Sequence, residues 1–290
     1  MTGIIEIGTI EPAVLVLGAG GAVGRGVLQA AVEAGRPVIA VSHDETALSA
    51  LRLQFPDAAL RTLEASVASD GDAAELAERL RALGISLAGV VACIAGEHPC
   101  GRLTEQPADV LRRTLDQDLM PHLFAARHLF PLLPQDGRHG YVLIGGPGAN
   151  YPWAGYGHCS IAASALRMMA RLLHDEAGRH GLRVQLLSLD APVGTDTNAA
   201  QAGVAWPKAV SIGRRALALL DAGRDAAVAA VVELQGQPAP PARRAMSRGQ
   251  PPPHAIDHMP ARELRDARAL LASLYALPPL SPGHLHDETC

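Results

Sequence analysis

Short apolar runs alternate with longer amphipathic stretches between positions 13 and 234. The short runs are rich in Val, Ile and Leu with little polar alternation, as in strands buried on both faces of a sheet. The longer stretches repeat their apolar residues with the period of a helix. The predicted strands are 13–17, 37–42, 59–63, 87–94, 141–144, 184–189 and 227–234, and the predicted helices are 22–34, 45–54, 72–83, 108–132, 160–179 and 207–221. Such repeated units require right-handed crossovers, so the pattern predicts an α/β fold with a doubly wound, parallel, seven-stranded sheet and helices on both faces.

The composition changes after Leu234. Residues 235–254 are dense in Pro and contain several Arg, which is typical of an extended connection. One further amphipathic helix is predicted at 260–276, followed by a tail with no apolar periodicity. We therefore divide the chain into a domain at 1–236 and an extension at 237–290, made of a Pro-rich connection, one helix and a flexible tail.

The bulk composition excludes several classes of protein. The chain has 290 residues, is 48% hydrophobic and carries a net charge of −4, which allows a sizeable core but gives no basic stripe for nucleic acid. The N-terminus lacks a basic signal region, and no apolar run approaches the roughly 20 residues that cross a bilayer. We expect a cytoplasmic protein that binds neither nucleic acid nor membrane.

The cysteines do not indicate a metal site in the sequence. They are Cys93, Cys100, Cys159 and Cys290, and their spacing is not that of paired metal ligands. His284, His286 and Cys290 in the tail could each bind a metal ion. The sequence shows no residues that would support them as ligands, so a solvated tail is the stronger interpretation. We expect reduced thiols and no metal.

The strongest local motif follows the first predicted strand. Positions 17–24 read LGAGGAVG, with Gly18, Gly21 and Gly24 at a regular spacing and Val23 between the last two. Glycines there allow a tight turn and the close approach of a pyrophosphate, while the N-terminus of the next helix supplies free N–H groups and its positive dipole end. The strand–turn–helix context predicts a Rossmann-type dinucleotide site.

The choice of dinucleotide depends on the tip of the second strand. An acidic residue there accepts from the adenosine ribose of NAD, whereas a basic one accommodates the 2′-phosphate of NADP. Ser42 and His43 occupy the tip, and Asp44 is better placed to cap the next helix. The cofactor is therefore NADP or NAD, and this pattern favours NADP weakly.

Further segments, in order, resemble the short-chain dehydrogenase/reductase family over roughly 12–236. The matching positions are Ala95 and Gly96 after strand four, Tyr156 in a Tyr-x-x-x-Lys-like segment that reaches Ser160, and Thr195 at a nicotinamide contact. Asp118 lies in the matching long helix and Gly146 after strand five. Ser66, followed by Val67, stands where the family commonly has an adenine-contacting Asp. The resemblance implies an NAD(P)-dependent oxidoreductase acting on a small molecule, with a proton-donating Tyr supported by Lys, Ser and Asn.

Most of that catalytic set is replaced. Tyr156 remains, but Ser160 stands at the Lys position, Asp118 at the Asn position and Gly146 at the Ser position. An unperturbed Tyr has a pKa of about 10, and lowering it by three units is worth about 4 kcal/mol. Without a basic neighbour, Tyr156 is a poor base but remains usable as an acid, so the family mechanism would favour carbonyl reduction. A purely structural Tyr156 is an equal alternative.

Other side chains near the expected crevice are weaker candidates. His98, close to Cys100 after strand four, is an alternative acid by position. His158 and Cys159 resemble a Cys/His pair, but neighbours on a helix point about 100° apart. Aromatic residues at 151, 153 and 206 would line an apolar substrate site or pack within loops.

Two functions from different classes follow. The first is an NAD(P)-dependent carbonyl reductase with Tyr156 as proton donor. The second is a catalytically inactive dinucleotide-binding sensor or scaffold whose output is a contact made by 237–290. Because the family resemblance also implies pairing of long helices, we expect a homodimer or homotetramer built on helices 108–132 and 160–179.

Overall fold

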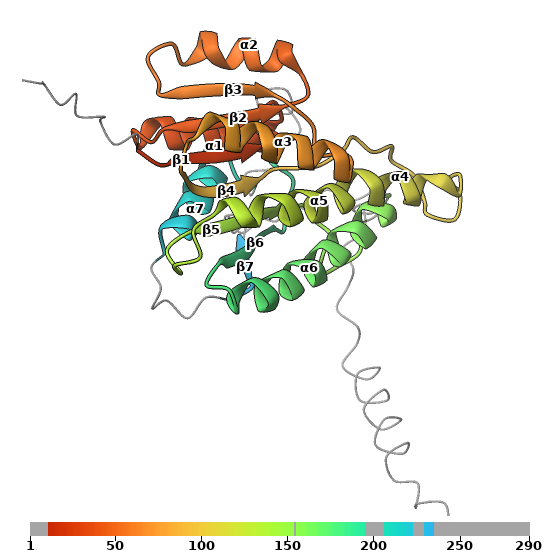
Figure 1. Ribbon diagram of the computed structural model, residues 1–290. Helices are drawn as coiled ribbons and strands as arrows, with labels where there is room; N and C mark the ends of the chain where they lie inside the picture. Colours follow the sequence, from red (N-terminus) through yellow and green to blue (C-terminus); the bar gives the residue numbers. More distant parts are fainter. Residues whose placement is uncertain (1–10, 154, 195–205, 223–228, 235–290) are drawn as a thin grey trace, which may run out of the picture. The chain divides into compact units, whose positions relative to one another are not determined.

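Seven parallel strands form one sheet within the residues that the computed structural model describes, which are 11–153, 155–194, 206–222 and 229–234 (Figure 1). The strands are β1 (Ala13–Leu17), β2 (Val38–Ser42), β3 (Leu60–Glu64), β4 (Leu87–Ala92), β5 (Gly140–Gly145), β6 (Arg183–Leu189) and β7 (Val231–Leu234). Their order is β3-β2-β1-β4-β5-β6-β7, and every neighbouring pair is parallel. The order reverses between β1 and β4, where the fold opens a crevice at the carboxyl ends of the strands.

Helices cover both faces of this sheet (Figure 1). On one face lie α1 (Ala22–Glu33), α2 (Glu45–Gln54) and α7 (Ala209–Asp221), and on the other lie α3 (Asp70–Leu83), α5 (Met120–Leu129) and α6 (Gly157–Gly178). Successive residues of a strand serve opposite faces. In β1, for example, Leu15 belongs to the core beneath α3, α5 and α6, whereas Val14 belongs to the core beneath α1, α2 and α7. The predicted doubly wound Rossmann-type fold is confirmed.

Helix α1 is held tightly by α7 through two glycines. A Cβ on Gly26 would lie 2.2 Å from the carbonyl carbon of Ala209, and a Cβ on Gly213 would lie 2.4 Å from the carbonyl oxygen of Gly26. Only glycine allows the two backbones to approach this closely. The contact fixes the helix whose N-terminus faces the crevice.

One predicted element is wrong. The expected single helix 108–132 is instead α4 (Asp109–Asp118), α5 and a short 3-10 turn, η1 (Phe130–Leu132). Pro121 is the second residue of α5. Because it has no N–H and its ring clashes with the carbonyl four residues earlier, it interrupts a helix that the apolar periodicity alone would continue. The break leaves Asp118 at the carboxyl end of α4, facing the crevice.

The remaining elements agree with the prediction to within a few residues. Strand β4 ends at Ala92 rather than 94, and α6 begins at Gly157 rather than 160. The predicted extension 237–290 lies outside the described residues. None of the helices among the described residues is both long and apolar enough to cross a membrane.

Candidate functional site

A cavity of about 270 Å³ opens at the carboxyl ends of β1, β4, β5 and β6. It is mostly apolar, and its lining includes Val23 from α1, Cys93, Ile94, Ala95, Gly96 and His98 after β4, Asp118, Ile144, Gly146, Pro147, Trp153, Cys159, Ala162, Ala163, Leu166, Leu189 and Val193. Five residues expected from the sequence to bind cofactor or replace catalytic groups therefore meet here: Val23, Ala95, Gly96, Asp118 and Gly146. The imidazole of His98 and the carboxylate of Asp118 line it, together with the thiols of Cys93 and Cys159 and the indole of Trp153.

The glycine turn lies at one end of this cavity. Gly18 has a φ of +68°, and a Cβ there would sit 2.1 Å from the carbonyl oxygen of Cys93. A Cβ on Gly24 would sit 2.1 Å from the carbonyl oxygen of Gly18. Both positions therefore need glycine for the turn itself, independently of any ligand.

Gly21 differs, because its own surroundings are open. Its backbone N–H donates to the Gly18 carbonyl over 3.1 Å, and it begins α1 without a side-chain cap among the described residues. The next two helices are capped, by Asp44 and by Ser69. An uncapped helix N-terminus beside a glycine turn suits the pyrophosphate of a dinucleotide, so these residues fit the predicted cofactor.

The expected adenosine end is a second hollow of about 280 Å³. Its lining includes His43, Ser66 and Arg79, together with acidic groups at Glu64, Asp72 and Glu75. Asp44 caps α2 through the amides of Thr46 and Ala47, at 2.8 and 3.2 Å, which confirms the role predicted for it.

Two other residues predicted near the adenosine do not line this hollow. Ser42 is buried and accepts a hydrogen bond from the Asp44 amide over 3.1 Å. Val67 is partly buried against the core. Thr195, predicted at the nicotinamide, lies outside the described residues.

An imidazole and a carboxylate form the polar wall of the main cavity. His98 Nε2 lies 2.7 Å from Asp118 Oδ2, and the Gly96 amide donates to Asp118 Oδ1 over 2.7 Å. His98 Nδ1 lies 3.5 Å from Thr114 Oγ1, which itself donates to the Val110 carbonyl. The carboxylate thus fixes the imidazole, and the pair can hold and release a proton at the cavity wall.

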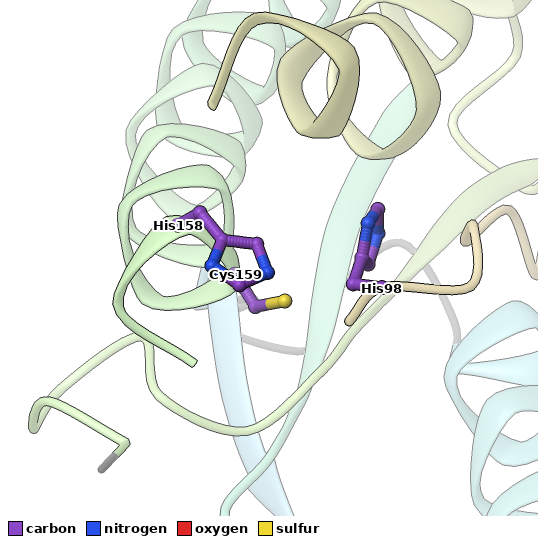
Figure 2. Close-up of side chains that lie close together, drawn as sticks. All are labelled: His98, His158 and Cys159. Carbon is purple, nitrogen blue, oxygen red and sulfur yellow. The ribbon is translucent and has the colours of Figure 1, made fainter. Parts of the chain in front are cut away.

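A second imidazole faces the first. His158 is 0% exposed, neither of its ring nitrogens has a hydrogen-bond partner among the described residues, and its ring meets that of His98 edge-on at 5.8 Å. Burial, followed by the neighbouring His98, lowers the pKa of His158. Cys159 projects toward the same place from the next position on α6 (Figure 2).

Cys159 is a poor nucleophile in this setting. Burial, and then the nearby Asp118 carboxylate, raises the pKa of its thiol to about 11. A thiol that holds its proton is unreactive toward electrophiles. The ligand atoms of His98, His158 and Cys159 nevertheless lie within 4.8 Å of one another. The sequence did not indicate this group, because His98 comes from a loop about sixty positions before α6 and no local motif joins them.

Tyr156 lies beside the cavity but is not among the described residues that line it. Its ring stacks on Trp153 with centroids 4.5 Å apart. Burial, and then the Cys100 thiol to which it is hydrogen-bonded, raises the pKa of Tyr156. It is therefore even less able to act as a base than its sequence context suggested.

Ser160, at the position of the expected Lys, has a structural contact. It is buried, accepts a hydrogen bond from the Trp153 amide over 2.9 Å and donates to the Tyr156 carbonyl over 3.2 Å. A Cβ on Gly148 would lie 2.6 Å from its hydroxyl oxygen. Ser160 thus fixes the loop between β5 and α6.

A larger hollow of about 450 Å³ continues from the cavity along this loop. Its lining includes Asn150, Tyr151 and Trp153 from the loop, and Glu233 from β7. Glu233 is hydrogen-bonded to Asn150 and forms an ion pair with Arg167 of α6. No motif in the sequence indicates the Glu233–Arg167 pair, because these residues meet only when β7 pairs with β6. Trp206 is described but does not line either hollow.

A family model described as enoyl-(acyl carrier protein) reductase matches residues 18–233. No curated protein matches the sequence.

Solved structures with the same fold are distant in sequence. A short-chain dehydrogenase from Streptomyces avermitilis is 20% identical with a TM-score of 0.68, over 91% of this chain and 96% of that one. A short-chain oxidoreductase from Pseudomonas aeruginosa PAO1, bound to NADPH and described as containing an atypical catalytic centre, is 19% identical with a TM-score of 0.68, over 83% and 98%. A short-chain type dehydrogenase/reductase from Mycobacterium ulcerans is 22% identical with a TM-score of 0.66, over 77% and 87%.

Proposed function

The chain belongs to the short-chain dehydrogenase/reductase family, and from this premise we propose that it reduces the carbonyl group of a small, largely apolar substrate with NADPH. The observation that carries the proposal is the His98–Asp118 pair at the wall of an apolar cavity that begins at the glycine turn. A bound nicotinamide would supply hydride to the carbonyl carbon. The chain must then supply a proton to the carbonyl oxygen.

His98 is the donor that the geometry favours. It lines the cavity, its side chain is 10% exposed, and Asp118 holds the ring by one of its two nitrogens. After donating its proton, neutral His98 takes another from water. Tyr156, the donor expected from the sequence, is the competing candidate, but it is stacked on Trp153 and does not line the cavity in the described residues.

Three observations support NADPH over NADH. In the described residues at the tip of β2, Asp44 is occupied as a helix cap and Ser42 is buried. His43 and Arg79 line the adjacent hollow and would meet a 2′-phosphate. The Pseudomonas aeruginosa structure is described as NADPH-bound.

We also propose that the protein is a homo-oligomer assembled through α6 and its neighbours. Ile161, Met168 and Leu172 of α6 and Leu123 of α5 are 39–54% exposed in the single chain. In contrast, Leu166 and Leu173, which the sequence also placed at the interface, face the sheet and belong to the core. The exposed set is the apolar surface available to a second copy.

The test combines turnover with direct cofactor binding. NADPH oxidation would be followed with a panel of aldehydes and ketones, in a buffer with a metal chelator, for wild type, His98→Gln and Tyr156→Phe. Fluorescence titration would measure NADPH and NADH affinity in the same variants. His180→Gln is the matched control at an exposed position.

We expect turnover with at least one carbonyl, a loss of about a hundredfold or more in kcat for His98→Gln, and little change in the Tyr156→Phe variant. A loss confined to Tyr156→Phe would assign the proton to the tyrosine instead. Cofactor binding without turnover of any substrate would favour the inactive sensor.

A further inference from the structure

The reaction proposed above does not involve the buried imidazole of His158. Both its nitrogens are buried and have no hydrogen-bond partner among the described residues. Burying a polar ring without partners is unfavourable, and each such group in a folded protein calls for an explanation. A ligand that accepts the lone pair of one ring nitrogen would satisfy that nitrogen and so reduce the penalty.

The neighbours of His158 are themselves ligand types. One donor atom each from His98, His158 and Cys159 can be chosen so that all three lie within 4.8 Å of one another. Ligands of a tetrahedral zinc ion lie roughly 3.4–3.8 Å apart, given bonds of about 2.0–2.1 Å to nitrogen and 2.3 Å to sulfur. Contraction by about an ångström, through small side-chain rotations, would give that geometry (Figure 2).

The surroundings of His98 are those of a metal-bound histidine. A ligating imidazole commonly donates its other N–H to a carboxylate, which fixes the ring and increases its basicity. Asp118 lies 2.7 Å from His98 Nε2 and is itself held by the Gly96 amide. With Nε2 paired to Asp118, the nitrogen available to a metal is Nδ1, whose described neighbour is the Thr114 hydroxyl at 3.5 Å.

We propose that His98, His158 and Cys159 bind a divalent ion of the zinc type, with Asp118 as the supporting carboxylate and the fourth position open to the 270 Å³ cavity. Two nitrogens and one sulfur select zinc or cobalt over magnesium and calcium, which prefer oxygen. Cys159 binds as thiolate, and its proton is released to solvent.

The ion would act on the proposed reaction through His98. With a metal on one nitrogen of His98, the remaining ring proton is held by Asp118 and cannot reach a substrate. Resting on the proposed function, an occupied site is therefore an inhibited reductase. The cavity would then have two states: one that holds zinc and does not reduce substrate, and one without zinc that does. The sequence predicted no metal, since two of the ligands are adjacent and the third is distant in the chain.

The test is metal binding by the full-length protein, measured apart from activity. Co²⁺ would be titrated into chelator-treated protein and followed by the thiolate-to-cobalt charge-transfer absorption, and Zn²⁺ affinity would be measured by competition with a chromophoric chelator. The variants are Cys159→Ser and His158→Phe. Cys290→Ser and Cys100→Ser are matched controls, because Cys290 lies near two other histidines in sequence and Cys100 is exposed. Thermal unfolding without metal would check that each variant is folded.

We expect one ion per chain, loss of the charge-transfer band in Cys159→Ser, at least a tenfold weaker Zn²⁺ affinity in His158→Phe, and no change in the two controls. The absence of the band in wild type, or its loss in Cys290→Ser with retention in Cys159→Ser, would overturn the proposed site. Reductase activity is read separately. If zinc binds at these residues but does not inhibit, the site stands and the assignment of His98 as proton donor fails.

Discussion

His98 and Asp118 are twenty positions apart in the chain, yet His98 Nε2 lies 2.7 Å from Asp118 Oδ2. The second carboxylate oxygen accepts the amide of Gly96, also at 2.7 Å. One side chain at the end of α4 therefore fixes both the backbone after β4 and the ring that faces the cavity. The arrangement depends on the helix break at Pro121, which ends α4 beside the cavity.

Replacing Asp118 by Asn should reduce activity without unfolding the protein. The amide oxygen can still accept from Gly96, but its NH₂ group would face His98 Nε2 and favour the opposite tautomer. We expect kcat/KM to fall at least tenfold, about 1.4 kcal/mol in the barrier, with a small change in Tm. Steady-state kinetics in a chelating buffer would measure this. Asp116→Asn, exposed on the same helix, should behave as wild type. Equal kinetics for the two variants would remove Asp118 from the site.

The glycine turn gives a matched pair of substitutions. At Gly21 the φ is −75° and the nearest contact of a new Cβ is 3.4 Å, so Gly21→Ala should fold normally. Its methyl group would stand against the helix N-terminus, and we expect NADPH affinity to fall about tenfold. Gly18→Ala, with a positive φ and a 2.1 Å clash, should instead lose about 2 kcal/mol or more of stability. Thermal unfolding and NADPH fluorescence distinguish the two effects. A Gly21→Ala variant that binds NADPH like wild type would contradict the assigned phosphate site.

Restoring lysine at Ser160 should damage the protein rather than activate it. The side chain is 8% exposed and holds the Trp153 amide and the Tyr156 carbonyl. Ser160→Lys would bury an ammonium group and remove both contacts, which we expect to cost about 2 kcal/mol or more. Chemical unfolding would measure the loss. Ser164→Lys, at an exposed position one turn later, is the control. A stable and more active Ser160→Lys variant would refute this interpretation of Ser160.

Buried His122 should make stability depend on pH below neutrality. Burial lowers its pKa to about 4, despite a hydrogen bond to the Ile94 carbonyl that raises it. The unfolded chain binds a proton near pH 6.5 and the folded one only near pH 4, so the stabilisation is complete above 6.5 and is lost as the pH falls toward 4. The slope is about 1.4 kcal/mol per pH unit. Urea unfolding at several pH values should show a flatter profile for His122→Gln, which cannot titrate. Identical profiles would show that His122 is not responsible.

The proposed assembly predicts the effect of a charge on α6. Leu172 is 54% exposed in the single chain, and Leu172→Glu should give monomers, because a carboxylate would be buried at the interface. Light scattering at micromolar concentration measures the mass. Leu53→Glu, at an 83% exposed position on α2, should leave the oligomer intact. A monomeric wild-type protein would rule out the proposal.

The sequence by itself determined the succession of strands and helices along the chain, the glycine turn and the cap at Asp44. These features are local: strand and helix periods, a tight turn and a capping contact each involve residues a few positions apart. The prediction of a single helix at 108–132 was wrong because it, too, relied on local apolar spacing. That spacing continues through Pro121, where the structure breaks the helix.

Only the tertiary structure decided which side chains meet in the cavity. Each residue along a helix turns the side-chain direction by about 100°, so the rotation of α6 against the sheet decides whether Cys159 lines the cavity, while Tyr156 precedes the helix with a non-helical backbone. The structure puts Cys159 on the wall, stacks Tyr156 on Trp153, and brings His98 to them from the loop after β4. That rotation is set by packing between α6, α4 and the sheet, whose contacts join residues far apart in the chain and leave no periodic signal in the sequence.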